Sequence, residues 1–142
     1  MSTVLYTPDV LALATGLAAF PLTDDLPLRG EARSRSCGST LLIGLEPDGA
    51  GRIARLGLRA QACAIGQAAA AIFAGHAVGR SAAELAAAET ALAAWLDGTG
   101  AMPDWPGLAA IAAARDYPAR HGAILLAWRA ALSALSSGGQ GG

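Results

Sequence analysis

The sequence divides into a short stretch with strand signals and a long alanine-rich remainder, and this division constrains the fold more than any other feature. The strand signals lie between residues 31 and 59, and from Ala64 onward the composition is typical of helices. Aromatic residues make up only 5% of the chain and apolar residues 54%, so the core must consist mainly of Ala, Leu, Ile and Val. Side chains this small favour closely packed helices beside a small sheet. The pattern predicts an α+β fold.

Turn and capping residues predict where the elements begin and end. Three strands are expected, over residues 31–36, 40–46 and 52–59, with Pro47-Asp48-Gly49 as the turn between the last two. The residues between 20 and 30 include two prolines and predict a loop. Five helical segments are expected, one before the sheet and four after it: from Thr7-Pro8-Asp9 onward, 64–75, 81–97 from a Ser81–Glu84 capping box to the stop at Gly98, 108–114, and about 120–135.

These elements predict one domain. A chain of 142 residues is long enough to bury a real core. We expect a small three-stranded antiparallel sheet packed against a bundle of about four to five helices in residues 1–135. The polar residues 136–142 are predicted to form a flexible tail.

Charge and hydropathy exclude several classes of protein. Ten arginines, with no lysine, balance eleven acidic residues, and no stretch gathers the basic side chains as a nucleic-acid-binding surface would. The most apolar run, residues 62–77, falls short of the roughly 20 residues that a membrane span requires. The N-terminus lacks the pattern of a secretory signal, so a cytoplasmic protein is expected. No Ser-His-Asp set, phosphate-binding glycine loop or pair of catalytic carboxylates is evident, so we do not expect an enzyme.

The two cysteines, Cys37 and Cys63, are the candidate reactive residues. In a reducing cytosol they are better interpreted as free thiols, metal ligands or sulfur carriers than as a disulfide, although two small buried core residues remain the alternative. Cys37 lies in a turn before Gly38, which allows a close approach of the backbone. Cys63 opens an apolar helix, whose N-terminus stabilises a thiolate. Trp95, Trp105 and Trp128 are interpreted as core or loop anchors.

Five short motifs follow one another along the chain: Cys37-Gly38-Ser39, Ala62-Cys63-Ala64-Ile65-Gly66-Gln67-Ala68, Gly79-Arg80-Ser81, Tyr117-Pro118-Ala119-Arg120 and Trp128. Together and in this order they resemble the IscU/NifU/SufU-type family of iron-sulfur cluster assembly scaffold proteins, with the SufU branch the most similar, and the resemblance covers residues 7–135. The resemblance implies a SufE/NifU-like fold and a scaffold or carrier that binds iron and sulfide transiently. It further implies a 2Fe-2S cluster or zinc as the bound species. A cysteine desulfurase and apo iron-sulfur acceptor proteins are the implied partners.

The resemblance also implies a ligand set that this chain does not complete. The family's aspartate after Cys-Gly is Ser39 here, and its third cysteine corresponds to Ala123, or to Gly122 if the alignment slips by one residue. Zinc and two-iron clusters are usually held by four ligands. His121 and Ser39 are therefore candidate replacement ligands beside Cys37 and Cys63. A second protomer in a homodimer, an exogenous thiol, or support from Arg120 are other ways to complete the site.

Two further hypotheses stay open at this point. One is a degenerate scaffold-like module that accepts sulfur from a cysteine desulfurase, or regulates it, without holding a cluster. The other is a thiol redox protein, although the chain lacks a Cys-x-x-Cys motif. His76 is interpreted as structural, because it lies about 20 Å along the helix from Cys63.

Overall fold

The structure is a computed structural model that describes residues 7–35 and 38–140, with side chains described as far as residue 136. Helices and strands follow the predicted order of helix, three strands and further helices. The elements are α1 (Pro8–Gly16), η1 (Leu17–Ala19), β1 (Leu28–Arg33), β2 (Thr40–Pro47), β3 (Ile53–Gln61), α2 (Ala64–His76), α3 (Ala82–Leu96), η2 (Leu108–Asp116), η3 (Pro118–Arg120) and α4 (His121–Gln140). The α+β class and the helix-backed sheet are confirmed.

The three strands form one antiparallel sheet in the order β1-β2-β3. At one end of the sheet Thr40 pairs with Arg33 on one side and with Gln61 on the other. Strand β1 begins at Leu28, three residues earlier than predicted, and shortens the predicted loop. The reason is that Leu28, Gly30 and Ala32 alternate toward α4, so the inward face of this strand consists of small or apolar residues.

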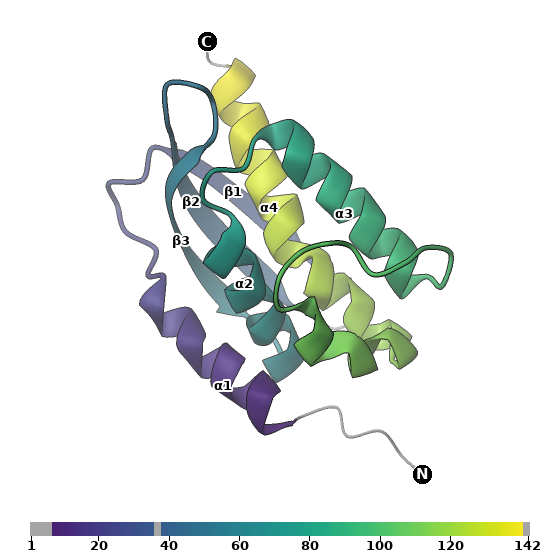
Figure 1. The fold of residues 1–142 in the computed structure, drawn as a ribbon. Coiled ribbons are helices and arrows are strands. Elements are labelled where there is room, and N and C mark those ends of the chain that lie inside the picture. Colours follow the sequence, from purple (N-terminus) through teal and green to yellow (C-terminus); the bar gives the residue numbers. More distant parts are fainter. Residues whose placement is uncertain (1–6, 36–37, 141–142) are drawn as a thin grey trace.

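The helices cover one face of the sheet in layers (Figure 1). Helix α4 packs against β1 and β2, and α2 packs against β3. Helix α3 lies on the far side of α4, and α1 lies against α2. Glycine makes the closest of these contacts: a Cβ on Gly30 would lie 2.1 Å from the carbonyl oxygen of Ala130. The backbone of α4 therefore rests directly on β1.

The other face of the sheet is covered over only part of its area. A Cβ on Gly57 would lie 2.0 Å from the Pro21 carbonyl oxygen, and one on Gly44 would lie 2.8 Å from the Leu26 Cβ. These two glycines pair across β2 and β3 and leave room for the segment after α1 to cross the sheet. Beyond Gly44, toward Thr40, the face is open, and Leu42 is 37% exposed there.

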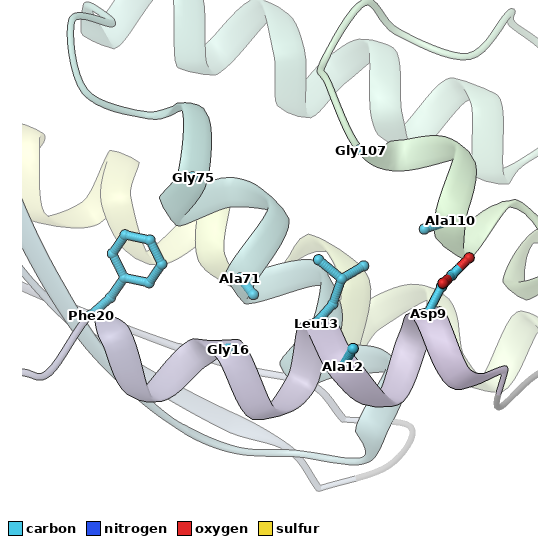
Figure 2. Close-up of a pocket in the computed structure, with 9 residues that line it drawn as sticks. All are labelled: Asp9, Ala12, Leu13, Gly16, Phe20, Ala71, Gly75, Gly107 and Ala110. Atoms are coloured by element: carbon cyan, nitrogen blue, oxygen red, sulfur yellow. The ribbon is translucent and has the colours of Figure 1, made fainter.

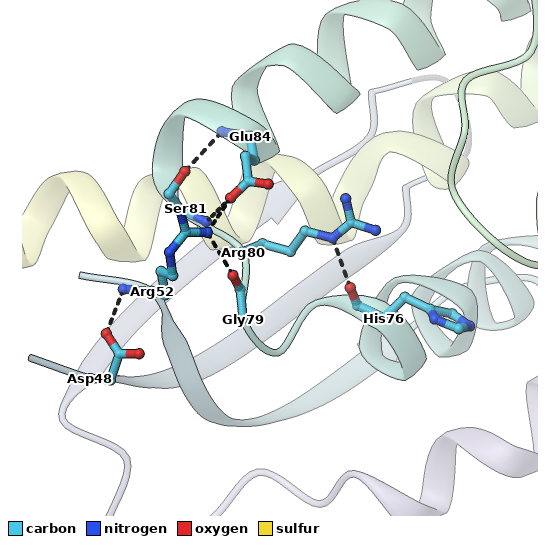
Figure 3. A network of polar contacts seen from close by, with 7 residues as sticks. All are labelled: Asp48, Arg52, His76, Gly79, Arg80, Ser81 and Glu84. Carbon is cyan, nitrogen blue, oxygen red and sulfur yellow. Dashed lines mark hydrogen bonds and ion pairs between the residues drawn. The ribbon is translucent and has the colours of Figure 1, made fainter. Parts of the chain in front are cut away.

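Polar contacts join the hairpin between β2 and β3 to the start of α3 (Figure 3). The Arg52 guanidinium donates to the Gly79 carbonyl at 2.8 Å and pairs with Glu84 at 2.5 Å. The predicted capping box is present, with Ser81 and Glu84 each accepting a bond from the other's backbone N–H. Hydrogen bonds from the Ser81 backbone and from Arg52 lower the pKa of Glu84 below its ordinary range. This junction fixes the register of α3 relative to the sheet.

The tryptophans are core anchors, as predicted. Trp105 stacks on Phe73 with ring centroids 5.6 Å apart, and Trp128 meets Phe73 edge-on at 5.2 Å. Trp105 also donates its indole N–H to the Ile72 carbonyl at 3.0 Å. Trp95 is 5% exposed. The Arg80 guanidinium lies over the Trp105 ring, 4.2 Å from its centroid, so the segment between α3 and η2 is held against the connection that follows α2.

The last helix is longer than predicted, because α4 continues to Gln140 rather than ending near Leu135. The flexibility expected of residues 136–142 stays a prediction. Within the described residues no helix is long and apolar enough to cross a bilayer.

Candidate functional site

Cys63 occupies the residue that precedes the first turn of α2. Its backbone is extended, with φ −63° and ψ 168°, and its carbonyl accepts the first helical hydrogen bond, from Gln67 at 2.9 Å. The side chain is half-buried and makes no hydrogen bond to the helix. The thiol therefore lies at the N-terminal end of the helix. The prediction that Cys63 opens this helix is confirmed.

The sheet register brings Ser39 to the same end of the molecule. Thr40 and Gln61 form the last pair between β2 and β3, so Ser39 and Cys63 follow that pair on adjacent strands. Ser39 is buried, at 4% exposure, and its carbonyl accepts the Ser34 N–H at 2.8 Å. Ser34 in turn accepts the Gly38 N–H at 3.0 Å. Cys37 precedes Gly38 in the sequence and lies outside the described residues.

Ala123, the residue that the sequence aligns with the family's third cysteine, lies beside the first turn of α2. A Cβ on Gly66 would lie 2.8 Å from the Cβ of Ala62 and 3.2 Å from that of Ala123. Gly66 is three residues after Cys63, a spacing that places two residues on the same side of a helix. Ala123 is 1% exposed. A side chain at position 123 therefore points toward the helix end that carries Cys63.

His121 begins α4 and is half-buried. Its Nε2 atom lies 2.8 Å from the Arg115 carbonyl oxygen. A carbonyl oxygen can only accept, so Nε2 carries the proton and Nδ1 is the nitrogen left to bind a metal. Two residues of helix turn the chain by about 200°, so His121 and Ala123 lie on opposite sides of α4. Arg120 is half-buried in η3, immediately before α4.

A complete metal-binding group is not assembled by the described residues. Within residues 7–35 and 38–140, no three His, Cys, Asp or Glu side chains are close enough to hold a metal ion together. His76 is exposed at the far end of α2, where its carbonyl accepts the Arg80 Nε–H at 3.0 Å. The motif Gly79-Arg80-Ser81 belongs to the junction with β3, because the Gly79 N–H bonds Ile53 at 2.8 Å.

An apolar groove of about 530 Å³ lies between α1, α2 and η2 (Figure 2). Leu13 and Phe20 point into it from the α1 side, and Asp9 is the one charged residue among the described residues that line it. The α2 residues in the groove, Ala71 and Gly75, belong to the half of the helix remote from Cys63. The described part of the lining contains no cysteine or histidine and so offers neither a thiolate nor an imidazole to iron or zinc.

Sequence reasoning missed a gathering of arginines beside the cysteine end of the sheet. Arg33 and Arg59 are 26 residues apart in the chain but lie in neighbouring rows of one sheet face, because Arg33 pairs with Thr40 and Arg59 with Leu42. Arg35 follows β1 at the same end. A scan for consecutive basic residues cannot detect such a group. The alternation of arginines within both strands, combined with the register, would have revealed it.

The chain matches solved structures although its sequence alone matches little. No family model matches it, and no curated protein matches it at a significant level. A NifU-like protein (N-terminal) from Brucella abortus, described as nitrogen-fixing, is 26% identical and superposes with a TM-score of 0.87, over 97% of this chain and 96% of that chain.

Two further solved structures share the fold at lower identity. A putative iron-sulfur cluster assembly scaffold protein for the SUF system, from Fervidobacterium islandicum AW-1, is 19% identical with a TM-score of 0.80, over 92% of this chain and 96% of that one. A hypothetical protein is 18% identical with a TM-score of 0.65, over 89% of this chain and 96% of that one. The end-to-end match to the NifU-like protein, together with the ordered motifs, supports the IscU/NifU/SufU-type family.

Proposed function

We propose that this chain is an iron-sulfur cluster assembly scaffold or carrier, which binds iron and sulfide transiently through the thiolates of Cys37 and Cys63. The observation that carries the proposal is the end-to-end similarity to a NifU-like protein, at 26% identity, combined with the position of Cys63 at the N-terminus of α2. The name of the Fervidobacterium neighbour, a scaffold for the SUF system, supports the same function.

The cap of α2 supports a chemical rather than a structural role for Cys63. The chain caps α1 with Thr7 and α3 with Ser81, and both side chains accept a backbone N–H. Cys63 occupies the same position in α2 without such a bond. A serine there would contribute on the order of 1 kcal/mol to stability. A cysteine at a position where serine stabilises better is expected when the thiol itself is needed.

The sulfur step that we propose needs only a thiolate and a sulfur donor. A cysteine desulfurase is the proposed donor, with the sulfur carried as a persulfide on its own cysteine. Attack of the Cys63 thiolate on the outer sulfur forms a new S–S bond and breaks that of the donor, which leaves as a thiolate. The outer sulfur of the new persulfide must then be reduced by two electrons from an external dithiol or ferredoxin-type reductant, which releases it as sulfide for iron at the same end of the sheet. Sulfide supplied directly needs no such reduction.

The remaining ligands are also proposals. Ser39 lies next to Cys63 across the end of the sheet and could support or bind the metal through its hydroxyl oxygen. His121 could bind only through Nδ1, and a side chain from a second copy of the chain could complete the set. We propose a 2Fe-2S cluster as the cargo, with zinc as an alternative occupant and apo iron-sulfur proteins in the cytoplasm as the acceptors.

Anaerobic reconstitution with iron, sulfide and thiol tests the function. We expect the wild-type chain to retain iron and to show visible sulfur-to-iron absorption, and both Cys37→Ser and Cys63→Ser to lose them. Because serine is a better cap than cysteine, Cys63→Ser should unfold at an equal or higher denaturant concentration. Ser39→Ala and His121→Ala, measured in parallel, report whether either side chain contributes to retention.

A colourless, metal-free wild-type protein would contradict the proposal. Loss of colour accompanied by unfolding of both cysteine variants would also contradict it, because the thiols would then be structural. Cys63→Ser is the decisive variant of the two, since its local geometry predicts intact folding.

A further inference from the structure

The arginines of this chain differ in whether their guanidinium groups have a firm partner within the fold. Five are held by carbonyl oxygens, carboxylates or a ring within the fold: Arg29, Arg52, Arg55, Arg80 and Arg115. Arg120 also interacts within the fold, and Arg129 of α4 has a long ion pair with Glu89, 3.9 Å between the nearest atoms. Arg33 has only a long ion pair with Glu31, 3.8 Å between the nearest atoms, and its side chain is 73% exposed. Arg35 and Arg59 are exposed and make no hydrogen bond or ion pair with any residue that the structure describes.

The weakly held arginines outside α4, Arg33, Arg35 and Arg59, all lie at one end of the sheet. Arg33, Thr40 and Gln61 form the last row of the open face, and Glu31, Leu42 and Arg59 form the next row. Paired residues of an antiparallel sheet point to the same face. These two rows line a shallow groove of about 300 Å³. The groove ends where the chain continues to Ser39 on one strand and to Cys63 on another.

We propose that this arginine face, defined as Arg33, Thr40, Leu42, Arg59 and Gln61 with Arg35 at its margin, docks an acidic segment of the protein that delivers sulfur to Cys63. The inference rests on the proposed function and adds to it the surface and the chemistry of the partner. The segment carries carboxylates, which bind guanidinium groups through paired hydrogen bonds.

The composition of the face favours a protein segment over other polyanions. Leu42 lies between the two arginines on the middle strand and is 37% exposed, so the face has an apolar centre and a polar rim. That arrangement, with arginine among the enriched residues, is typical of protein interfaces. Glu31 lines the same groove, so the face offers separate cationic points for individual carboxylates rather than the continuous positive strip that a phosphate backbone or an anionic membrane requires. The whole chain has a net charge of −1, which gives no general attraction to such surfaces.

The position of the face explains what docking there would achieve. The last row of the face, Arg33-Thr40-Gln61, adjoins the residues that lead to the candidate ligands. A partner bound on it is held beside Cys63 without covering α2, α3 or α4, which lie on the other face of the sheet. Charges placed around a reactive end also increase the rate of encounter with an oppositely charged partner, and salt weakens that effect.

Two measurements on the full chain test the proposal. In the first, the isotope-labelled protein is titrated with a synthetic peptide that carries glutamates on both sides of a leucine, and backbone amide resonances are followed. We expect shifts centred on Thr40, Leu42, Arg59 and Gln61. In the second, binding of a purified cysteine desulfurase is measured against salt concentration for the wild type and for a double variant, Arg33→Glu with Arg59→Glu.

The double variant should bind the desulfurase at least about tenfold more weakly and with a smaller dependence on salt. Arg129→Glu is the matched control, because its side chain is 49% exposed and holds a similarly long ion pair, at 3.9 Å, on the helical side of the molecule. We expect that control to bind as the wild type does. Both variants should unfold at the denaturant concentration of the wild type, since none of these arginines is buried.

Equal binding by the double variant and the wild type would overturn the proposal, as would peptide shifts confined to another surface. Tighter binding of a single-stranded oligonucleotide or of phosphatidylglycerol vesicles to the same residues would overturn it as well. Reconstitution with free sulfide needs no partner and therefore separates the two proposals. If reconstitution gives a cysteine-dependent colour but the arginine variants bind the desulfurase as the wild type does, only the docking surface is refuted. If the protein stays colourless but its binding to the desulfurase depends on the arginines, only the cluster is refuted.

Discussion

Replacing Gly30 with alanine tests the contact on which the position of α4 depends. The added methyl group would lie 2.1 Å from the carbonyl oxygen of Ala130 and 2.7 Å from the backbone nitrogen of Ala134. Both are backbone atoms of the helix, so no side-chain rotation can relieve the overlap. An ordinary contact needs at least 3.4 Å, and α4 must therefore move away from β1 by about 1 Å.

That displacement disturbs the packing of α4 on both β1 and β2, where Ile43 and Ala134 are fully buried. Overpacking a rigid site usually costs about 1–3 kcal/mol. A clash between the β1 residue and backbone atoms of α4 lies at the upper end of this range, because neither backbone can rotate away. We expect Gly30→Ala to lower the free energy of unfolding by about 3 kcal/mol. For a chain of this length the melting temperature should fall by about 10 °C.

Chemical denaturation followed by tryptophan fluorescence measures the loss directly, because all three tryptophans are buried and move into water on unfolding. Gly75→Ala is the matched control: it makes the same chemical change in α2, where a Cβ would meet nothing within 4 Å. Helix propensity should make that control more stable by up to about 1 kcal/mol. Equal stability of Gly30→Ala and the wild type would refute the direct contact between the α4 backbone and β1.

Two further predictions concern the site and the acid limit of the fold. Combining Ala123→Cys with Ser39→Asp should increase the retention of iron or zinc severalfold, because both positions border the end of α2 that carries Cys63. Metal analysis measures the retention, and an unchanged value would place the missing ligands elsewhere. The pKa of Glu84 is lowered by its bonds to the Ser81 backbone and to Arg52, so its contribution to stability is present above its ordinary value of 4.5 and is lost as the pH falls through the lowered value. Denaturation midpoints of Glu84→Gln should therefore lie below those of the wild type at neutral pH and converge with them in acid, whereas a constant difference would contradict the assigned contacts.

Local signals in the sequence predicted most of the fold. Thr7 and Ser81 are helix caps, and the Pro47-Asp48-Gly49 hairpin closes through the Asp48 carboxylate, which accepts the N–H groups of Ala50 and Arg52 at 2.8 and 2.9 Å. These predictions succeeded because each motif satisfies its own backbone groups within a few residues.

The misplaced start of β1 and end of α4 had a different cause. Strand β1 begins early because its inward residues pack on a helix a hundred residues later in the chain, and α4 continues through Gly138 and Gly139, where local signals predict an end. The arginine face was missed for the same reason, since a strand register brings it together. Contacts between distant segments leave no signal in a short window of sequence.

For the candidate site, the sequence identified residue types and the structure supplied their arrangement. Sequence spacing could not decide between Gly122 and Ala123 as the position of the missing cysteine. The contact between Ala123 and the first turn of α2 favours Ala123, and the half-turn of helix between His121 and Ala123 places the histidine on the other side of α4. A new side chain at position 123 is therefore better placed than His121 to take the role of the third cysteine.

The departures from local stability rules concentrate at one end of the sheet. Cys63 is an N-cap without a capping bond, whereas the chain caps α1 and α3 with side chains that make one. Three arginines without a firm partner, Arg33, Arg35 and Arg59, adjoin the same end, whereas most of those elsewhere are bonded within the fold. Residues that stabilise a fold satisfy their groups internally, and residues kept for a ligand or partner leave them available. Because a thiol without a capping bond and weakly held guanidinium groups occur at this one end of the sheet, the cysteine end is where we expect this fold to meet other molecules.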